Sequence, residues 1–170
     1  MEKVVLVNEK DEEIGTIEKM QAHEKALLHR AFSVFVFNSL GKLLLQKRAL
    51  SKYHSPGLWT NTCCSHPRPG EKTIDAANRR LKEEMGFETG LEFAFSFVYK
   101  AEMENGLTEH EFDHVYFGLH DDMPAINTEE VSEWKYESLE EIAKDIKLHP
   151  ENYTAWFKIV FNKIVALKST

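Results

Sequence analysis

Residues 60–67 read Thr-Asn-Thr-Cys-Cys-Ser-His-Pro, and residues 73–86 read Thr-Ile-Asp-Ala-Ala-Asn-Arg-Arg-Leu-Lys-Glu-Glu-Met-Gly. The first stretch places two thiols and an imidazole beside a rigid proline. The second has the apolar spacing of one helical face, at Ile74, Ala77, Leu81 and Met85. Thr73 is the expected N-cap of this helix, and Gly86 suits the position that ends many helices. Arg80 and Glu84 are four residues apart, so we expect them to neighbour each other on a shoulder of the apolar face.

The two adjacent cysteines divide between packing and chemistry. Neighbouring residues of a strand face opposite sides, so only one of Cys63 and Cys64 can belong to a site. His66 shares the side of Cys64. We therefore expect Cys63 to pack in the core and Cys64 to be the functional thiol. Free cysteines are most often small buried hydrophobes, and that alternative applies to both residues.

Composition limits the class of protein. The chain has 170 residues, of which 42% are hydrophobic, and this suits one domain over residues 1–170. The net charge of −7 disfavours nucleic-acid binding, which relies on a basic surface. The sequence contains no run of roughly 18 apolar residues, so no membrane span is expected. The N-terminus lacks a secretory cleavage pattern, so a cytoplasmic protein is expected.

Strands and helices are expected on both sides of the opening stretch. Patterns typical of strands occupy residues 3–8, 14–17, 31–38, 42–46, 59–64, 92–100, 109–119 and 133–137. Helical patterns occupy residues 18–30, 73–85, a segment capped by Ser138 with Glu141, and residues 151–167. Alternation places one row of side chains on a single strand face, at Phe93, Phe95, Phe97 and Tyr99. The order predicts an α+β domain in which helices flank a mixed sheet.

Two carboxylates are expected to converge on one strand. Glu109 and Glu111 are two residues apart, so they face the same side. When two carboxylates lie this close together, either the pKa of one of them is raised or a cation neutralises them. The alternative is an acidic edge strand that faces solvent.

Three histidines lie near these elements: His23, His29 and His66. Together with the two carboxylates they would form a mixed nitrogen and oxygen site, which suits Mn²⁺, Fe²⁺ or Zn²⁺. Glu84 on its helix shoulder suits Mg²⁺, which prefers carboxylate and phosphate oxygens. The alternative for each histidine is a structural or solvated side chain. No role is assigned to the other five, His54, His110, His114, His120 and His149.

Several cations and two aromatic residues complete the candidates. The side chains suited to holding phosphate are Lys19, Arg48, Lys52 and Arg80. Tyr99 ends its row of phenylalanines, so we expect an enclosed ring whose hydroxyl reaches a partner. Trp156 is either a core residue or a π face against a cationic centre.

Taken together, these residues resemble the type 1 isopentenyl-diphosphate Δ-isomerases, which have a Nudix-type fold. The resemblance runs from about Val4 to beyond Trp156. It is carried by Arg48-Ala-Leu-Ser-Lys52, Trp59-Thr60-Asn61, Cys64-Ser65-His66-Pro67, Arg79-Arg80, Glu83-Glu84-Met85-Gly86, Glu109 and Glu111. Residues 65–87 also resemble a degenerate Nudix box. This segment departs from the box at Ser65, where the box has Gly, and at Arg80, where the box has a Glu that hydrolases use.

The resemblance implies isomerisation of isopentenyl diphosphate to dimethylallyl diphosphate through a carbocation. It implies that Cys64 and Glu111 are the acid and base on opposite faces of the substrate, with Tyr99 assisting Glu111. Trp156 would stabilise the carbocation and exclude water. The four cations would clamp the diphosphate.

The resemblance also implies two metals. A divalent ion such as Mn²⁺ or Zn²⁺ would bind His23, His29, His66, Glu109 and Glu111. Mg²⁺ on the diphosphate would be held by Glu84 and the backbone near Cys64. A monomer or weak homodimer is expected. Two alternatives stay open, a Nudix pyrophosphohydrolase of nucleoside diphosphate derivatives and a non-catalytic metal- or diphosphate-binding domain. The thiol, Arg80 and Trp156 favour the isomerase.

Overall fold

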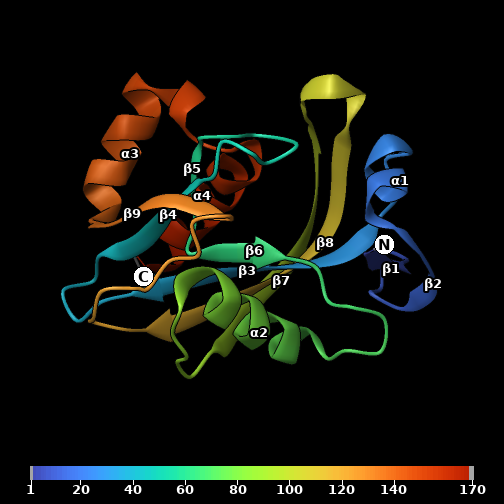
Figure 1. Ribbon diagram of the computed structural model, residues 1–170, viewed down its shortest axis with the longest axis horizontal. Coiled ribbons are helices and arrows are strands. Elements are labelled where there is room, and N and C mark those ends of the chain that lie inside the picture. The colour runs from blue at the N-terminus through green and yellow to red at the C-terminus, as the bar shows by residue number, and fades with distance from the viewer. Residues whose placement is uncertain (1, 169–170) are drawn as a thin grey trace.

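The computed structural model describes residues 2–168 and has a mixed β-sheet at its centre (Figure 1). Its strands are Lys3–Val7 (β1), Glu13–Glu18 (β2), His29–Phe37 (β3), Leu43–Arg48 (β4), Trp59–Thr60 (β5), Cys63–Ser65 (β6), Glu92–Glu102 (β7), Thr108–Leu119 (β8) and Val131–Glu137 (β9). The helices are Lys19–Glu24 (α1), Thr73–Met85 (α2), Leu139–Leu148 (α3) and Ala155–Lys168 (α4), with short 3₁₀ turns at Glu104–Gly106 (η1) and Pro150–Asn152 (η2). None of the helices within residues 2–168 combines the length and hydropathy that a membrane crossing requires.

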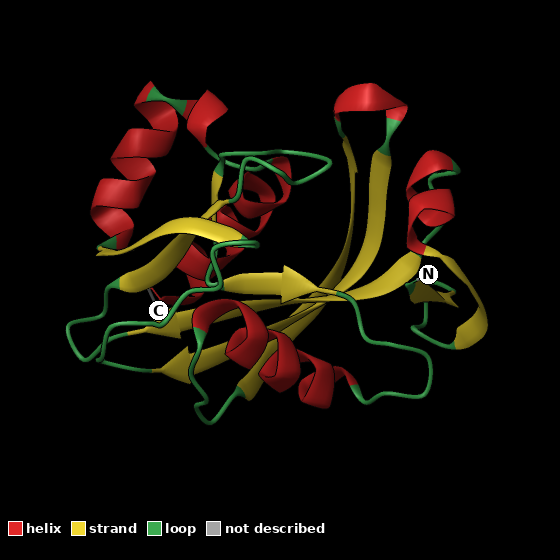
Figure 2. Ribbon diagram, viewed as in Figure 1, coloured by secondary structure: helices red, strands yellow, loops and turns green. Residues whose placement is uncertain are grey.

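Strand β3 organises the sheet. It runs parallel to β8, from the pair His29 and Glu111 to the pair Phe37 and Leu119. It also pairs antiparallel with β6, and through single residue pairs with β1 and β4. Helix α2 lies against one face of this sheet, while α3 and α4 lie on the other side (Figures 1 and 2). The predicted α+β architecture is therefore confirmed.

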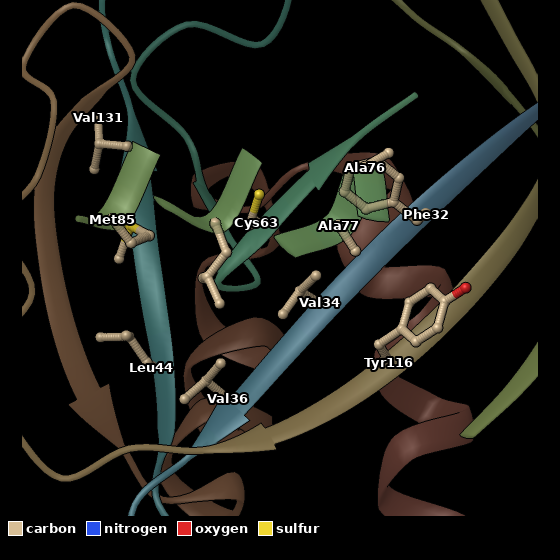
Figure 3. Packing of buried hydrophobic residues seen from close by; sticks show 11 residues of the cluster. Phe32, Val34, Val36, Leu44, Cys63, Ala76, Ala77, Met85, Tyr116 and Val131 are labelled. Carbon is tan, nitrogen blue, oxygen red and sulfur yellow. The ribbon is translucent and has the colours of Figure 1, made fainter. Parts of the chain in front are cut away.

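The first core lies between α2 and the sheet (Figure 3). Alternate residues of β3 supply Phe32, Val34 and Val36, which meet the apolar face of α2. Cys63 is fully buried in this cluster, as expected for a packing residue. This core fixes α2, and with it the shoulder that carries Arg80 and Glu84, beside β6.

The second core lies between the sheet and the two C-terminal helices. The remaining residues of β3, such as Phe35 and Phe37, pack here with Val115 of β8 and Phe157 of α4. Toward the start of β3 and of β8 the same sheet face changes from apolar to polar. The register places Ser33 and His29 on this face, two and six residues before Phe35. The candidate functional side chains therefore lie on the same sheet face as this core, beyond its apolar part.

Three helix boundaries differ from expectation. Thr73 is the first residue of α2, and the N-cap is Lys72, whose side chain makes no capping hydrogen bond. The final helix begins at Ala155 rather than near 151, because residues 150–152 form a 3₁₀ turn and the Thr154 hydroxyl accepts from Phe157 N. The helix expected over 18–30 ends at Glu24, since His29 already begins β3.

Two strand expectations also need correction. The strand expected over 59–64 is two short strands, β5 and β6, that pair with β4 and β3 respectively. Phe93 does not share a face with Phe95, Phe97 and Tyr99, because a bulge shifts the register of β7 between Phe93 and Phe95. The side chain of Phe93 is therefore exposed, while the other three rings follow one another. The expected caps are confirmed at Gly86, which has φ 74°, and at Ser138, which accepts from Glu141 N.

Candidate active site

A cavity of about 560 Å³ opens where the polar part of the sheet face meets α2, the loop after β4 and Trp156. Each predicted site residue lines it except His23 and His29, which lie buried behind His66 and Glu111. Segments far apart in the chain supply the walls. The structure thus brings together what the sequence presents as scattered residues.

The centre of the site is the contact of two imidazoles with one carboxylate. The parallel register places Glu111 beside His29, and His66 follows β6 into the same space. His29 Nε2 lies 3.2 Å from His66 Nε2 and 3.2 Å from Glu111 Oε2, and His66 Nε2 lies 2.8 Å from that oxygen. His29 Nδ1 is 2.9 Å from the carbonyl oxygen of Leu27, a contact that orients the ring so that Nε2 points toward His66 and Glu111. Three atoms that can each bind a metal, one from each residue, therefore converge, and a cation would stabilise this arrangement.

His23 of α1 completes this group. It is 1% exposed, and neither ring nitrogen has a hydrogen-bond partner among the described residues. Burial and the neighbouring His66 lower the pKa of His23 to about 3, so the ring is neutral. One donor atom from each of His23, His29, His66 and Glu111 lies within 4.8 Å of the other three. Three imidazoles and a carboxylate fit a divalent ion of the Mn²⁺ or Zn²⁺ kind.

Glu109 lies next to this group without belonging to it. Its Oε2 is 3.9 Å from His23 Nε2, and it is not among the four converging donors. Ligation by Glu109 therefore stays a prediction. Burial and the neighbouring Glu111 raise the pKa of Glu109 well above its usual range. Burial would also raise the pKa of Glu111, but hydrogen bonds with His29 and His66 outweigh it and hold that pKa well below its usual range.

Tyr99 links the two carboxylates. Its hydroxyl oxygen lies 3.0 Å from Glu109 Oε1 and 2.5 Å from Glu111 Oε1. Burial and the two acids raise the pKa of Tyr99, so the hydroxyl keeps its proton. That proton can be donated to one carboxylate at a time. The expectation of an enclosed ring with a partnered hydroxyl is confirmed.

Cys64 lines the cavity from β6, while Cys63 faces α2. In the sheet Cys64 pairs with Ser33, which also lines the cavity. Burial raises the pKa of the Cys64 thiol, so the sulfur carries its proton at neutral pH. The expected positions, Cys63 in the core and Cys64 at the site, are confirmed, and the catalytic role of Cys64 stays a prediction.

The four predicted cations all line the cavity, together with three further basic residues: Lys19, Arg48, Lys52 and Arg80 were predicted, and Lys3, Arg68 and Arg79 join them. Each of the two predicted lysines contacts an acid, Lys19 with Glu2 at 3.1 Å and Lys52 with Glu130 at 2.6 Å. Arg48 donates to the carbonyl oxygen of His54 at 3.0 Å. The four side chains predicted to hold a diphosphate therefore share one cavity, and their role as an anion site stays a prediction.

Glu84 is buried at the junction of α2 and the cavity. Its Oε2 is 3.0 Å from Arg80 Nη2 and accepts from Cys63 Sγ at 3.4 Å, and its Oε1 accepts from Gln46 Nε2 at 3.1 Å. The expected contact between Arg80 and Glu84 is confirmed. A carboxylate offers roughly four lone-pair directions, so Glu84 retains capacity for a further partner.

His54, to which the sequence assigns no role, lies at the cavity. Its ring lines the cavity, is 5% exposed, and stands edge-on to the Trp156 indole with 5.6 Å between centroids. Tyr53, Glu2 and Glu130 line the cavity as well and were also missed. The signal for Tyr53 and His54 was their position directly after Lys52. Nothing local in the sequence marks Glu2 or Glu130. The other four histidines without an assigned role lie outside the cavity lining.

Comparison with known proteins defines first the class and then the family. Residues 27–157 match the NUDIX domain family. The solved structure of a MutT protein from Methanosarcina mazei Go1 has the same fold, with a TM-score of 0.69 at 18% identity, covering 84% of this chain and 96% of that one. The protein is therefore a Nudix-fold protein.

Closer relatives narrow this class. The chain is 50% identical to "Isopentenyl-diphosphate Delta-isomerase 2" of Aromatoleum aromaticum, over 99% of this chain and 89% of the relative. It is 54% identical to an isopentenyl-diphosphate Delta-isomerase of Pectobacterium atrosepticum, over 95% and 90% respectively. The chain belongs to the isopentenyl-diphosphate Delta-isomerase family, which confirms the resemblance seen in the sequence.

Proposed function

We propose that the protein interconverts isopentenyl diphosphate and dimethylallyl diphosphate by moving one proton on and another off the carbon chain. Isomerisation of isopentenyl diphosphate is the activity for which both relatives are named. One observation gives the strongest support for assigning this activity to the chain. A protonated thiol, Cys64, and an ionised carboxylate, Glu111, line a single cavity that also gathers the four predicted cations.

In this proposal Cys64 and Glu111 exchange protons with the substrate. Cys64 carries a proton at neutral pH and donates it to the terminal alkene carbon. Glu111 accepts a proton from the carbon on the other side of the resulting cation, and the hydroxyl of Tyr99 stabilises the carboxyl group at each stage. The reverse reaction uses the same groups in the opposite order. A carbocation reacts with water, so the buried walls of the cavity serve to exclude it.

Trp156 is proposed to stabilise the positive charge. The indole is 4% exposed and lines the cavity. The Arg48 guanidinium lies 5.2 Å from its ring centroid, so the ring already has one cationic neighbour. Diphosphate bound to Arg48 would neutralise that charge, and the indole would then face the carbocation without a competing repulsion.

The two metals are proposed to act on opposite ends of the substrate. A divalent ion held by His23, His29, His66 and Glu111, with Glu109 beside them, would supply positive charge and fix Glu111. Mg²⁺ held by Glu84 would neutralise the diphosphate, which Lys19, Arg48, Lys52 and Arg80 would clamp.

Incorporation of deuterium from D₂O into the product tests the proposal directly. With isopentenyl diphosphate, Mg²⁺ and Mn²⁺, deuterium should enter the allylic product. Cys64→Ala should abolish turnover while far-UV circular dichroism and metal content stay unchanged. Full turnover by that variant would exclude the proposed acid.

The same incubation separates the alternatives. Arg80 on α2 stands where a hydrolase has Glu, which disfavours pyrophosphate cleavage by this chain. Release of phosphate from nucleoside diphosphate derivatives, without isomerisation, would support a hydrolase instead. Neither activity with both metals supplied would support a binding domain. The cytoplasmic location, the monomer or weak homodimer and the box-like role of residues 65–87 stay predictions.

A further inference from the structure

Glu130 joins two of the proposed diphosphate holders. It directly precedes β9 and lines the cavity. Its Oε2 lies 2.6 Å from Lys52 Nζ, and its Oε1 lies 3.5 Å from Arg80 Nη2. We infer that Glu130 is a positioning residue, which holds Lys52 and Arg80 close together so that both meet one diphosphate. This inference rests on the proposed function, because it takes these two cations as the diphosphate clamp.

The two cations need such a link because different elements carry them. Lys52 lies in the loop after β4, and Arg80 lies on α2. A lysine side chain has many rotamers, and only some of them point into the cavity. An anion between the two cations selects the rotamers that converge and offsets the repulsion between like charges.

Glu130 is itself well anchored. Its carbonyl oxygen accepts from Ala49 N at 3.0 Å, and its own N–H donates to the carbonyl oxygen of Asn127 at 2.9 Å. Asn127 N in turn donates to the carbonyl oxygen of Glu84 at 2.9 Å. The segment 127–130 is thus tied both to the loop that carries Lys52 and to the end of the helix that carries Arg80.

The bridge leaves donors free for a ligand. Lys52 has three N–H donors and Arg80 has five. Glu130 is within reach of one nitrogen of each. Arg80 also contacts Glu83 through Nη1 at 3.1 Å and Glu84 through Nη2 at 3.0 Å, but its Nε is buried without a hydrogen-bond partner among residues 2–168. Burial opposes ionisation of Glu130, but its contacts with Lys52 and Arg80 outweigh this and lower its pKa, so it is charged at pH 7. Diphosphate can therefore bind without displacing the carboxylate.

The opposite hypothesis is that Glu130 competes with diphosphate for the same cations. The two hypotheses predict opposite changes in KM when the charge is removed. If Glu130 positions the cations, Glu130→Gln raises KM for isopentenyl diphosphate about tenfold, as expected for a lost charge-assisted contact, and leaves kcat within about twofold. The Kd of inorganic pyrophosphate with Mg²⁺ should weaken by a similar factor.

Glu133→Gln is the matched control. Glu133 lies on β9 three residues further on and contacts Lys47 at 3.2 Å, outside the cavity lining. The same substitution there should leave KM, kcat and Tm unchanged. Glu130→Asp keeps the charge on a shorter side chain and should give a KM between those of the wild type and Glu130→Gln. This variant also provides the measurement if Glu130→Gln does not fold.

A double-mutant cycle with Lys52→Met locates the effect. Lys52→Met alone should raise KM, and adding Glu130→Gln should raise it little further, because the positioned cation is already absent. An unchanged KM in Lys52→Met would refute the clamp and this inference together. A raised KM in Lys52→Met with no change in Glu130→Gln would refute the inference alone. A lower KM in Glu130→Gln, or a fall in kcat and Tm at constant KM, would overturn it as well.

Discussion

The Tyr99 hydroxyl has one proton and two carboxylate neighbours, so it can donate a hydrogen bond to only one of them at a time. Glu109 and Glu111 are both buried, yet their pKa values shift in opposite directions because only Glu111 contacts His29 and His66. Sequence spacing predicted that the two carboxylates converge, since residues two apart on a strand share a face. It did not distinguish their protonation, which depends on partners 45 and 82 residues away.

Tyr99→Phe should therefore impair catalysis while sparing the fold. The substitution keeps the ring in the row that follows Phe95 and Phe97 and removes the donor that Glu109 and Glu111 share. We expect kcat to fall about 100-fold, within the range for assisted acid–base catalysis, with metal content unchanged. Tyr136→Phe is the control, because the Tyr136 hydroxyl donates to main-chain oxygens of His120 and Asp122 away from the cavity. Equal kcat values for the two variants would refute the role of Tyr99.

His54 should make the metal-free protein sensitive to acid. Burial and Arg48 lower its pKa to about 3, against 6.5 in an unfolded chain. Between these values the unfolded state binds the proton and the folded state does not, so the free energy of unfolding falls as pH falls below about 6.5. From pH 7 to pH 5 the loss should be about 2 kcal/mol. Urea unfolding of chelator-treated protein measures it, and His54→Gln should reduce the loss. An equally steep pH dependence in the variant would contradict this assignment.

At the scale of elements, α2 shows how local signals succeed. Its apolar face, its end at Gly86 and the contact of Arg80 with Glu84 follow from spacing within one helix. The row on β7 shows where such signals fail, because the bulge after Phe93 depends on how β7 aligns with β8. The strand expected over 59–64 divides for a similar reason, since β5 and β6 pair with different neighbours. Periodicity along the chain carries no information about these pairings.

Substitution of Gly86 tests how closely the end of α2 packs against Ala125. Its φ of 74° is left-handed, and a Cβ there would collide with the carbonyl oxygen of Ala125. Gly41 has a similar φ of 77°, but a Cβ there would meet nothing within 4 Å. Gly41→Ala should cost about 1 kcal/mol of stability for the backbone conformation alone, and Gly86→Ala should cost roughly 2–3 kcal/mol. Denaturant unfolding of both variants separates the two contributions. Equal losses would mean that Ala125 moves aside freely.

At the scale of the molecule, the site is where three imidazoles from different parts of the chain meet one carboxylate. The sequence supplied the right histidines through resemblance to a family, because residue spacing alone does not bring His23, His29 and His66 together. Neither the spacing nor the resemblance assigned a role to His54, which lines the cavity from the loop after β4. Glu130 was missed because its partners lie on two other elements.

Metal removal should weaken the whole fold. The four converging donors exist as a group only in the folded chain, so a metal that binds them stabilises that state. At a free concentration 100 times Kd the gain is about 2.7 kcal/mol. We expect Tm to fall by several degrees when a chelator is added and to recover with Mn²⁺ or Zn²⁺. His66→Ala should abolish the recovery, whereas His149→Ala, an exposed residue outside the cavity, should keep it. A Tm independent of metal in the wild type would show that the group does not bind these ions.

The parallel pairing of β3 with β8 also has a consequence for the order of folding. Contact between His29 and Glu111 closes a loop of 82 residues, and such distant contacts form late. During synthesis β3 emerges from the ribosome long before its partner exists. The helix α2 and the hairpin of β7 and β8 can form from nearby residues, but the metal group cannot. Binding competence should therefore appear last in refolding, after most of the helical circular dichroism signal has returned.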